Sequence, residues 1–213
     1  MSSDQVRNPI FARLYTWLSR GAERAGAAEH RDENLAGLRG RVIEIGAGNG
    51  LNFTHYPPEV EEVVAVEPEP YLRARAQAAA EQAPVKVSVA DGTADRLPGA
   101  DGEFDAAVAS LVLCTVPDQA RSLAEARRVI RPGGELRFYE HVRAEDARLA
   151  RWQDRLARRI WPAVGGGCHP NRDTEAAIAA AGFEIEHARH FEWKPGPGMS
   201  FVSPHVIGVA RRP

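Results

Sequence analysis

Residues 42–50 read VIEIGAGNG, an apolar run followed by three alternating glycines. A short apolar run, typical of a buried strand, leads straight into Gly46, Gly48 and Gly50. Glycines directly after a strand let the backbone approach a ligand closely at the carboxyl edge of a parallel sheet. The dinucleotide fingerprint spaces its glycines as G-x-G-x-x-G, but here Leu51 occupies the third glycine position. The spacing is G-x-G-x-G, which speaks against a nicotinamide oxidoreductase.

An acidic residue stands at the distance that a nucleoside cofactor requires. Glu67 follows Gly46 by 21 positions and ends the apolar run of residues 60–68. A carboxylate at this place hydrogen-bonds the hydroxyls of a ribose, so the pair predicts an adenosine-type cofactor. The alternative is a tight strand-to-helix turn followed by a surface glutamate. Glu44, two residues before Gly46, belongs to the same candidate site.

Strand-like and helix-like patterns alternate along most of the chain. We expect helices in segments 8–36, 70–82, 118–134, 147–161 and 172–182, and strands in segments 41–46, 60–68, 85–92, 104–113, 135–142, 183–193 and 204–212. Alternation of this kind predicts a mostly parallel sheet with helices on both faces. The last two strands are joined by the Pro/Gly-rich segment 194–200, which favours an antiparallel hairpin at the sheet edge. The expected class is a doubly wound α/β fold.

Composition excludes several classes of protein. The net charge of −2 and the lack of a sustained basic stretch oppose a nucleic-acid partner. Two cysteines are too few for a disulfide framework, and the location predicted from them is a reducing cytoplasm. Arginines interrupt residues 1–26, so we expect no signal peptide, and no run approaches the apolar length of a membrane span. Contact with a membrane surface and the oligomeric state are left open.

Four successive motifs resemble those of the class I S-adenosylmethionine-dependent methyltransferases. They lie within residues 42–50, 63–70, 91–113 and 127–141. The resemblance spans about residues 41–141 and implies a Rossmann-like seven-stranded sheet whose last strand is antiparallel. It also implies S-adenosyl-L-methionine as the cofactor. Gly46, Ala47 and Gly48 would then pass under the methionine part, Glu67 would hold the ribose, and Pro68 would lie against the adenine.

The third motif departs from the common family pattern. Relatives often carry an aspartate that faces the adenine amino group, and its position here is Thr93, between Gly92 and Ala94. Adenine would then be read by backbone groups, by the Thr93 hydroxyl, or by Asp91. Further along the chain, the resemblance places Ser110 and Leu111 near the amino acid end of the cofactor.

A narrower resemblance concerns the acceptor. The chain is similar to a subgroup that includes the membrane-associated thiol methyltransferases of animals, and the similarity lies in segments 109–119, 139–146, 152–162, 165–174 and 204–210. Those enzymes carry a hydrophobic N-terminal anchor, which we do not find in this sequence. Enzymes that methylate lipid amines or quinone rings share the core motifs more loosely. The expected function is methyl transfer to a small, lipophilic thiol, amine or hydroxyl. A phospholipid or quinone-type methyltransferase and a non-catalytic cofactor-binding protein are the alternatives.

Methyl transfer to an amine or a hydroxyl needs a base near the acceptor proton, whereas a thiolate needs little beyond correct positioning. His141 ends a predicted strand at the ligand-binding edge and is the candidate base, with a packed structural role as the alternative. His205 has the same two interpretations. Tyr15 is a candidate for covering the pocket. Trp152 lies on an Arg-rich predicted helix whose apolar face is formed by Leu149, Trp152, Leu156 and Ile160. This helix is expected to cover the substrate opening, and the alternative is that it lies on a membrane surface.

The segment 164–173, VGGGCHPNRD, resembles a reactive site but is not predicted to be one. Cys168 and His169 are adjacent, which is poor geometry for two ligands of one metal ion, so no metal is expected. Methyl transfer needs no covalent enzyme intermediate, and Cys114 is expected to be a buried strand residue. The loop is therefore predicted to line the acceptor side of the pocket through Cys168, His169 and Arg172. Arg172 or Asp173 would cap the next helix.

These expectations combine into a single methyltransferase domain over residues 1–213. It comprises an N-terminal helical cap (1–40), a cofactor-binding core (41–141), a helical substrate-side insertion (142–182) and a terminal strand hairpin (183–213).

Overall fold

The computed structural model describes residues 8–158, 160–194, 196 and 198–213, so residues 1–7 of the predicted cap lie outside the described residues. Its strands are β1 (Gly40–Ile45), β2 (Val60–Val66), β3 (Lys86–Ala90), β4 (Phe104–Ser110), β5 (Ile130–His141), β6 (Glu184–Glu192) and β7 (Pro204–Arg211). They form one sheet in the order β3-β2-β1-β4-β5-β7-β6. Strands β1 to β5 pair in parallel, and β7 pairs antiparallel with both β5 and β6. The predicted fold class and the antiparallel edge hairpin are confirmed.

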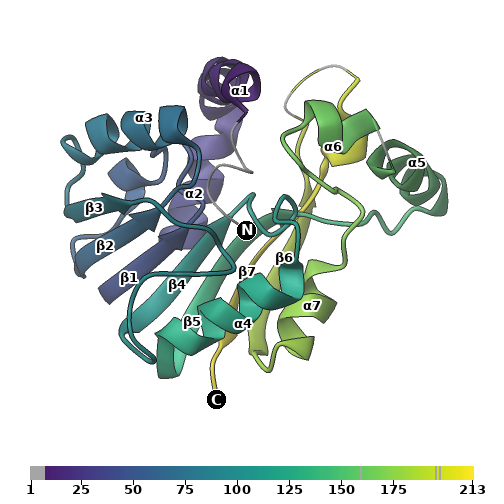
Figure 1. Ribbon diagram of the computed structural model, residues 1–213. Coiled ribbons are helices and arrows are strands. Elements are labelled where there is room, and N and C mark those ends of the chain that lie inside the picture. The colour runs from purple at the N-terminus through teal and green to yellow at the C-terminus, as the bar shows by residue number, and fades with distance from the viewer. Residues whose placement is uncertain (1–7, 159, 195, 197) are drawn as a thin grey trace.

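The helices are α1 (Pro9–Ala22), α2 (Ala28–Leu35), α3 (Pro70–Ala80), α4 (Gln119–Val129), α5 (Ala147–Ala157), α6 (Ile160–Val164) and α7 (Thr174–Ala180). Short helical turns occupy Glu23–Ala27, Phe53–His55 and Ser200–Val202. Figure 1 shows α2 and α3 on one face of the sheet, α4 and α7 on the other, and α1 and α6 at the top of the view. The segment predicted as one helix over 147–161 is divided between α5 and α6.

Two hydrophobic layers hold the sheet between its helices. Val42 of β1 packs in the layer that includes Leu35 of α2, whereas the next residue, Ile43, packs in the layer that includes Leu123 of α4. Successive side chains of a strand point to opposite faces, so an uninterrupted apolar run such as that of β1 indicates a strand covered on both sides. This burial fixes the strand ends, and with them the loops that carry the site.

Helices α1 and α5 do not bury several of their large apolar side chains. In α1 the buried residues are Ala12, Thr16 and Ser19, while Trp17 is 71% exposed. In α5 the buried residues are Ala150, Gln153 and Ala157, and Trp152 is 42% exposed. Periodicity shows which face of a helix is apolar, but small side chains allow the closest approach between backbones. Both helices turn small or polar residues inward and leave large apolar side chains at the surface.

Gln153 explains why α5 docks on this unexpected face. Its side-chain oxygen accepts a hydrogen bond from the Ala144 amide at 2.8 Å, and three backbone carbonyls lie within 3.1 Å of its amide nitrogen. These carbonyls belong to Val142, Pro170 and Phe201, which come from three separate segments. One buried amide therefore joins the end of β5, the loop of residues 164–173 (the glycine loop) and the turn before β7.

Candidate functional site

The glycine turn, residues 46–50, follows β1 and packs against the neighbouring strand ends. Gly46 and Ala47 donate backbone hydrogen bonds to the carbonyl of Val66, at 2.9 and 3.0 Å. Gly46 has φ = 68°, and a Cβ added there would stand 2.4 Å from a Val112 methyl group. This backbone conformation and this spacing admit only glycine without strain. The turn therefore presents bare backbone at the carboxyl edge of the sheet.

Glu67 closes this turn from the end of β2. One carboxylate oxygen accepts from the Gly48 amide and the other from the Glu69 amide, both at 2.8 Å. Each carboxylate oxygen has a second lone pair, so Glu67 retains capacity for two further donors such as the hydroxyls of a ribose. Burial raises the pKa of Glu67 to about 7, and the two amides oppose this rise. Glu67 is thus a desolvated acceptor held in one orientation, which fits the predicted cofactor.

A buried polar network links β1, the segment after the glycine turn and the end of β4. Glu44 accepts hydrogen bonds from Asn52 at 2.9 Å and from the Tyr56 hydroxyl at 2.8 Å. Burial raises the pKa of Glu44 to about 7, and these two hydrogen bonds lower it. The Ser110 hydroxyl accepts from the Asn52 and Asn34 amides, both at 3.2 Å. The side-chain oxygen of Asn34 is buried without a partner among the described residues, so a donor from a bound cofactor would satisfy it.

The loop after β3 engages the side chains that were candidates for adenine recognition. Asp91 is half exposed and forms an ion pair with Arg73 at 3.0 Å. The same Arg73 nitrogen also donates to the Pro68 carbonyl at 3.0 Å. A hydrogen bond from the Thr93 hydroxyl is the first cause of a lowered pKa at Asp95. Gly92 packs so tightly that an added Cβ would stand 2.9 Å from Val66, and Ala94 packs against the main hydrophobic layer.

A buried carboxylate fixes the loop that follows β4. Glu140 is fully buried, and its two oxygens accept hydrogen bonds from the amides of residues 112, 113 and 114, at 2.8 to 3.0 Å. Burial raises the pKa of Glu140, and the three amides oppose this rise. Leu111 starts the loop with φ = 56°, an uncommon conformation for a residue with a side chain. Glu140 is therefore committed to positioning this loop and is not free to act as a base.

Three side chains from three distant segments converge beside this loop. The Nδ1 atom of His141 lies 3.6 Å from the Sγ atom of Cys114 and 3.6 Å from the Sγ atom of Cys168, and the two sulfur atoms are 3.8 Å apart. Both cysteines are buried, and His141 is half-buried. The hydrogen bond with Cys168, together with burial, raises the pKa of the Cys114 thiol well above its usual range. The structure thus joins the candidate base to both cysteines of the chain.

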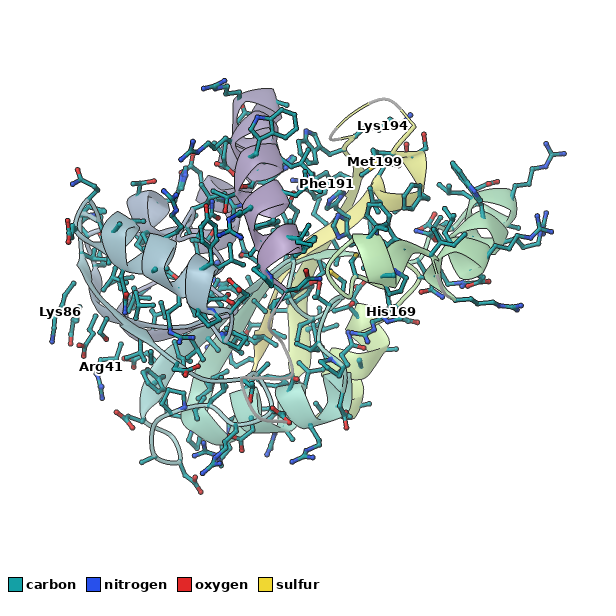
Figure 2. The ribbon with its side chains drawn as sticks, turned by 45° about the horizontal axis from the view of Figure 1, so that its top comes forward. Arg41, Lys86, His169, Phe191, Lys194 and Met199 are labelled. Carbon is teal, nitrogen blue, oxygen red and sulfur yellow. The ribbon has the colours of Figure 1, made fainter. Side chains whose placement is uncertain are left out.

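The glycine loop brings Cys168 to this cluster. A Cβ on Gly166, where φ is 64°, would stand 2.2 Å from the Phe11 ring, so helix α1 packs directly on the loop. The His169 amide donates to the Cys114 carbonyl at 2.7 Å, and the Arg172 guanidinium donates to the carbonyl of Leu113. Figure 2 shows His169 on the side of the molecule formed by the C-terminal segments, away from Arg41 and Lys86. Asp173, and not Arg172, caps α7 by accepting from the Ala176 amide at 3.0 Å.

His205 is buried next to the cluster, opposite His141 in the β5–β7 pairing. The two imidazole rings lie 4.6 Å apart. Burial lowers the pKa of His205 to about 2, so its ring is neutral at physiological pH. Its Nδ1 atom lies 2.7 Å from the Ser203 carbonyl and must donate there, which leaves Nε2 as an acceptor without a partner among the described residues. Tyr139, Phe191 and Trp193 surround this ring.

Two further predicted site residues come from helices at the same end of the molecule. Tyr15 of α1 covers the glycine turn, with its hydroxyl 3.5 Å from the place where a Cβ on Gly48 would stand. Trp152 of α5 packs edge-on against Phe201 and remains partly exposed. Figure 1 shows α1 and α5 apart from each other, with α6 between them.

The cluster of Cys114, His141 and Cys168 was missed by sequence reasoning, which treated Cys168 together with its neighbour His169. The three residues are separated by 27 positions in each interval, so no short motif marks them. Their meeting depends on sheet order and on the path of the glycine loop. The remaining signal in the sequence was that both cysteines fall in segments following a predicted strand or helix.

Comparisons with known proteins show similarity to methyltransferases. A family model described as "Methyltransferase domain" matches residues 43–138. A thiol S-methyltransferase of Homo sapiens, TMT1B, is 35% identical over 188 residues, which is 84% of this chain and 74% of that protein. A phosphatidylethanolamine N-methyltransferase of Cereibacter sphaeroides is 34% identical over 122 residues, covering 56% of this chain and 59% of that protein.

A solved structure shares the whole fold. It is a SAM-dependent methyltransferase of Thermotoga maritima, with a TM-score of 0.69 and 24% identity, covering 96% of this chain and 98% of that one. The chain therefore belongs to the class I S-adenosylmethionine-dependent methyltransferases. Within this family it resembles the thiol S-methyltransferases.

S-adenosyl-L-methionine is the cofactor of this enzyme, and the residues present fit it. The bare turn at Gly46 and the spare acceptor capacity of Glu67 fit the predicted methionine and ribose contacts, and the Asn34 oxygen has no partner among the described residues. None of the helices in the described part of the chain has the length and apolar character needed to cross a membrane.

Proposed function

We propose that this enzyme transfers a methyl group from S-adenosyl-L-methionine to the sulfur of a small, lipophilic thiol. The observation that carries the proposal is the group of side chains beyond the cofactor turn. His141 stands there between two buried sulfur atoms, and the adjacent acid Glu140 is occupied by three backbone amides. The identity of 35% with a thiol S-methyltransferase, over 84% of the chain, supports the same acceptor.

The chemistry favours a thiol at such a site. The bound cofactor supplies an electrophilic methyl group on a sulfonium, and the protein must hold the acceptor in line with it. The ordinary pKa of a thiol is about 8.5 and that of an imidazole is about 6.5, so proton transfer from the first to the second is opposed by a pKa difference of only about 2. An alkyl hydroxyl is a far weaker acid and would need a stronger base than the described residues offer here. We expect Glu67 and the turn at Gly46 to hold the cofactor, and His141 to face the acceptor.

His141 as the base is tested through the pH profile of its alanine variant. A base matters only while the thiol is protonated, so His141→Ala should lower kcat/KM more at pH 7 than at pH 9. For amine or oxygen acceptors, which need a base more than a thiol does, the loss should be larger than for thiols. An equal loss for all acceptors at all pH values would show that His141 only packs the pocket. Thermal unfolding of the variant checks that it remains folded.

A second candidate function is methyl transfer to a lipid amine. The similarity to phosphatidylethanolamine N-methyltransferase favours it, and so do the exposed side chains Trp17, Ile160 and Val164, which would suit contact with a membrane surface. Incubation with radiolabelled cofactor and a panel of thiols, amines, phenols and phospholipid vesicles separates the two functions. Label in an alkyl thiol but not in vesicles supports thiol transfer, and the reverse result supports the lipid amine.

We also propose a cytoplasmic location without a nucleic-acid partner. Two buried thiols 3.8 Å apart remain separate most readily in a reducing compartment, and a net charge of −2 gives no attraction to phosphate backbones. Fractionation of cells that express the tagged protein tests the location. Recovery of the protein mainly with extracellular material would contradict it.

A further inference from the structure

The distances within the cluster of Cys114, His141 and Cys168 form a nearly equilateral triangle of ligand atoms. Its sides are 3.6 Å for each sulfur-to-Nδ1 separation and 3.8 Å between the two sulfur atoms. All three atoms are of the types that bind soft divalent metal ions. Each distance alone is also an ordinary contact between thiols and an imidazole. The feature that requires explanation is that the three distances agree with one another.

Tetrahedral zinc coordination predicts these three lengths. With Zn–S bonds of about 2.3 Å and a Zn–N bond of about 2.05 Å, tetrahedral angles give roughly 3.8 Å between sulfurs and roughly 3.6 Å between sulfur and nitrogen. The observed sides of the triangle are 3.8, 3.6 and 3.6 Å. An ion placed at bonding distance from all three atoms would therefore need little movement of the side chains.

The backbone holds each ligand in place independently. The amide of Cys114 donates to Glu140 at 3.0 Å, and its carbonyl accepts from the His169 amide at 2.7 Å. The amide of Cys168 donates to the Gly165 carbonyl at 3.2 Å. His141 lies in the last pair of the β5–β7 ladder. A ligand set that is fixed before the metal arrives loses little conformational freedom on binding.

We propose that Cys114, His141 and Cys168 bind one zinc ion, or a soft divalent ion of similar size, with a fourth coordination position left open. Two thiolates balance the charge of the ion, so the buried site is electrically neutral. Among the described residues no fourth histidine, cysteine or acid joins the group. Three protein ligands and one open position are typical of zinc sites that act on a substrate.

The open position suits the sulfur of the acceptor, a step that rests on the proposed thiol transfer. A thiol that binds there releases its proton to solvent and becomes a thiolate. Its lone pair then attacks the cofactor methyl group, the bond from that methyl to the sulfonium breaks, and S-adenosylhomocysteine leaves as a neutral thioether. The methylated acceptor is also a thioether, which binds zinc weakly and departs. In this scheme the ion lowers the thiol pKa and so replaces His141 as the group that promotes loss of the thiol proton, and His141 serves as a ligand of the ion.

Metal binding is tested directly on the whole protein, purified with a phosphine reductant, stripped with a chelator and titrated with zinc and with cobalt(II). We expect about one ion per chain, and cobalt should give the intense visible bands of a tetrahedral site together with sulfur charge-transfer absorption. Cys114→Ser, Cys168→Ser and His141→Ala should each weaken binding by about 100-fold or more. His169→Ala is the matched control, because His169 adjoins Cys168 but is outside the triangle, and it should still bind one ion.

Several outcomes would overturn the proposal. One is a chain that binds no ion although it binds S-adenosylhomocysteine and both thiols are reduced. Another is equal metal affinity in the wild type and in all three ligand variants. A third is a Cys114–Cys168 disulfide that forms in air and is unaffected by zinc, which would make the cysteines a redox pair. Each variant's affinity for S-adenosylhomocysteine shows whether it is folded.

The two proposals fail in distinguishable ways. If zinc binds in a 1:1 ratio but no thiol is methylated, the acceptor assignment is wrong and the metal site stands. If a thiol is methylated at the same rate by the stripped and the zinc-loaded protein, the metal inference is wrong and the proposed function stands. Perturbation of the cobalt bands by an alkyl thiol, but not by the alcohol of equal chain length, would place the acceptor on the ion.

Discussion

Replacement of Glu67 by glutamine tests how the cofactor is held. The carboxylate has one oxygen on the Gly48 amide and the other on the Glu69 amide, each at 2.8 Å. Glutamine keeps the shape but exchanges one oxygen for an NH2 group. In either orientation that group faces a backbone N–H, so two donors oppose each other and one hydrogen bond is lost. The variant also removes the charge that would receive the ribose hydroxyls.

The expected loss of affinity follows from these contacts. Hydrogen bonds to a charged group contribute about 1.5 to 3 kcal/mol each, and part of this remains with the oxygen that glutamine retains. We therefore expect Glu67→Gln to weaken binding by about 1 to 3 kcal/mol, which is about 5- to 150-fold in Kd. Glu67→Ala should lie in the same range.

Isothermal titration with S-adenosylhomocysteine measures this directly. The matched control is Glu69→Gln, because the Glu69 side chain belongs to the same loop but caps α3, where it accepts from the Leu72 amide at 2.8 Å. That variant should change Kd by less than about 2-fold. An affinity of Glu67→Gln within about 2-fold of the wild type, in a protein that unfolds normally, would refute the ribose assignment.

The pH dependence gives a second test of the same residue. The pKa of Glu67 is raised to about 7 by burial, and only the ionised form can accept from both ribose hydroxyls. The affinity of the wild type should therefore fall as the pH is lowered from 8 to 6. Glu67→Gln should show no such dependence. A wild-type affinity that is constant over this range would contradict the account.

Three further predictions concern stability. Burial raises the pKa of Glu44 from 4.5 to about 7, so the folded protein loses stability as the pH rises between these two values. Thermal melts at pH 5 and pH 8 should show that Glu44→Gln removes about 1 to 3 kcal/mol of this loss. A wild type that gains stability from pH 5 to pH 8 would contradict this prediction. Gly166→Ala should destabilise by about 1 to 3 kcal/mol in urea, because its Cβ meets the Phe11 ring, whereas Gly196→Ala, with open space around it, should be near neutral. Gln153→Leu should cost roughly 2 to 4 kcal/mol, since three buried carbonyls lose their donor, and a loss below 1 kcal/mol would show that the amide does not join these segments.

Local signals in the sequence predicted the cofactor half of the site. The glycine turn at 46–50 follows its strand directly, and Glu67 stands 21 positions after Gly46, so strand alternation and motif spacing were sufficient to predict that these residues lie together. The seven-stranded sheet and its antiparallel last strand also followed from the family resemblance, and the structure confirms them.

The acceptor half depends on tertiary contacts that no local pattern encodes. Cys114, His141 and Cys168 meet where the neighbouring strands β4 and β5 end and where the glycine loop, packed against Phe11 of α1, passes beside them. The orientation of α1 and α5 could not be predicted for a similar reason. Large apolar side chains such as Trp17 and Trp152 lie at the surface, and the packed faces are those with Ala12 and Gln153.

A competition experiment tests whether this methyltransferase transfers its methyl group to sulfur. The enzyme is given S-adenosyl-L-methionine with an alkyl thiol, an amine and an alcohol of equal chain length, at equal concentration in one vessel. Mass spectrometry then identifies the methylated products. We expect the methyl thioether to dominate and Glu67→Gln to slow its formation. Preferential methylation of the amine or the alcohol would contradict the account.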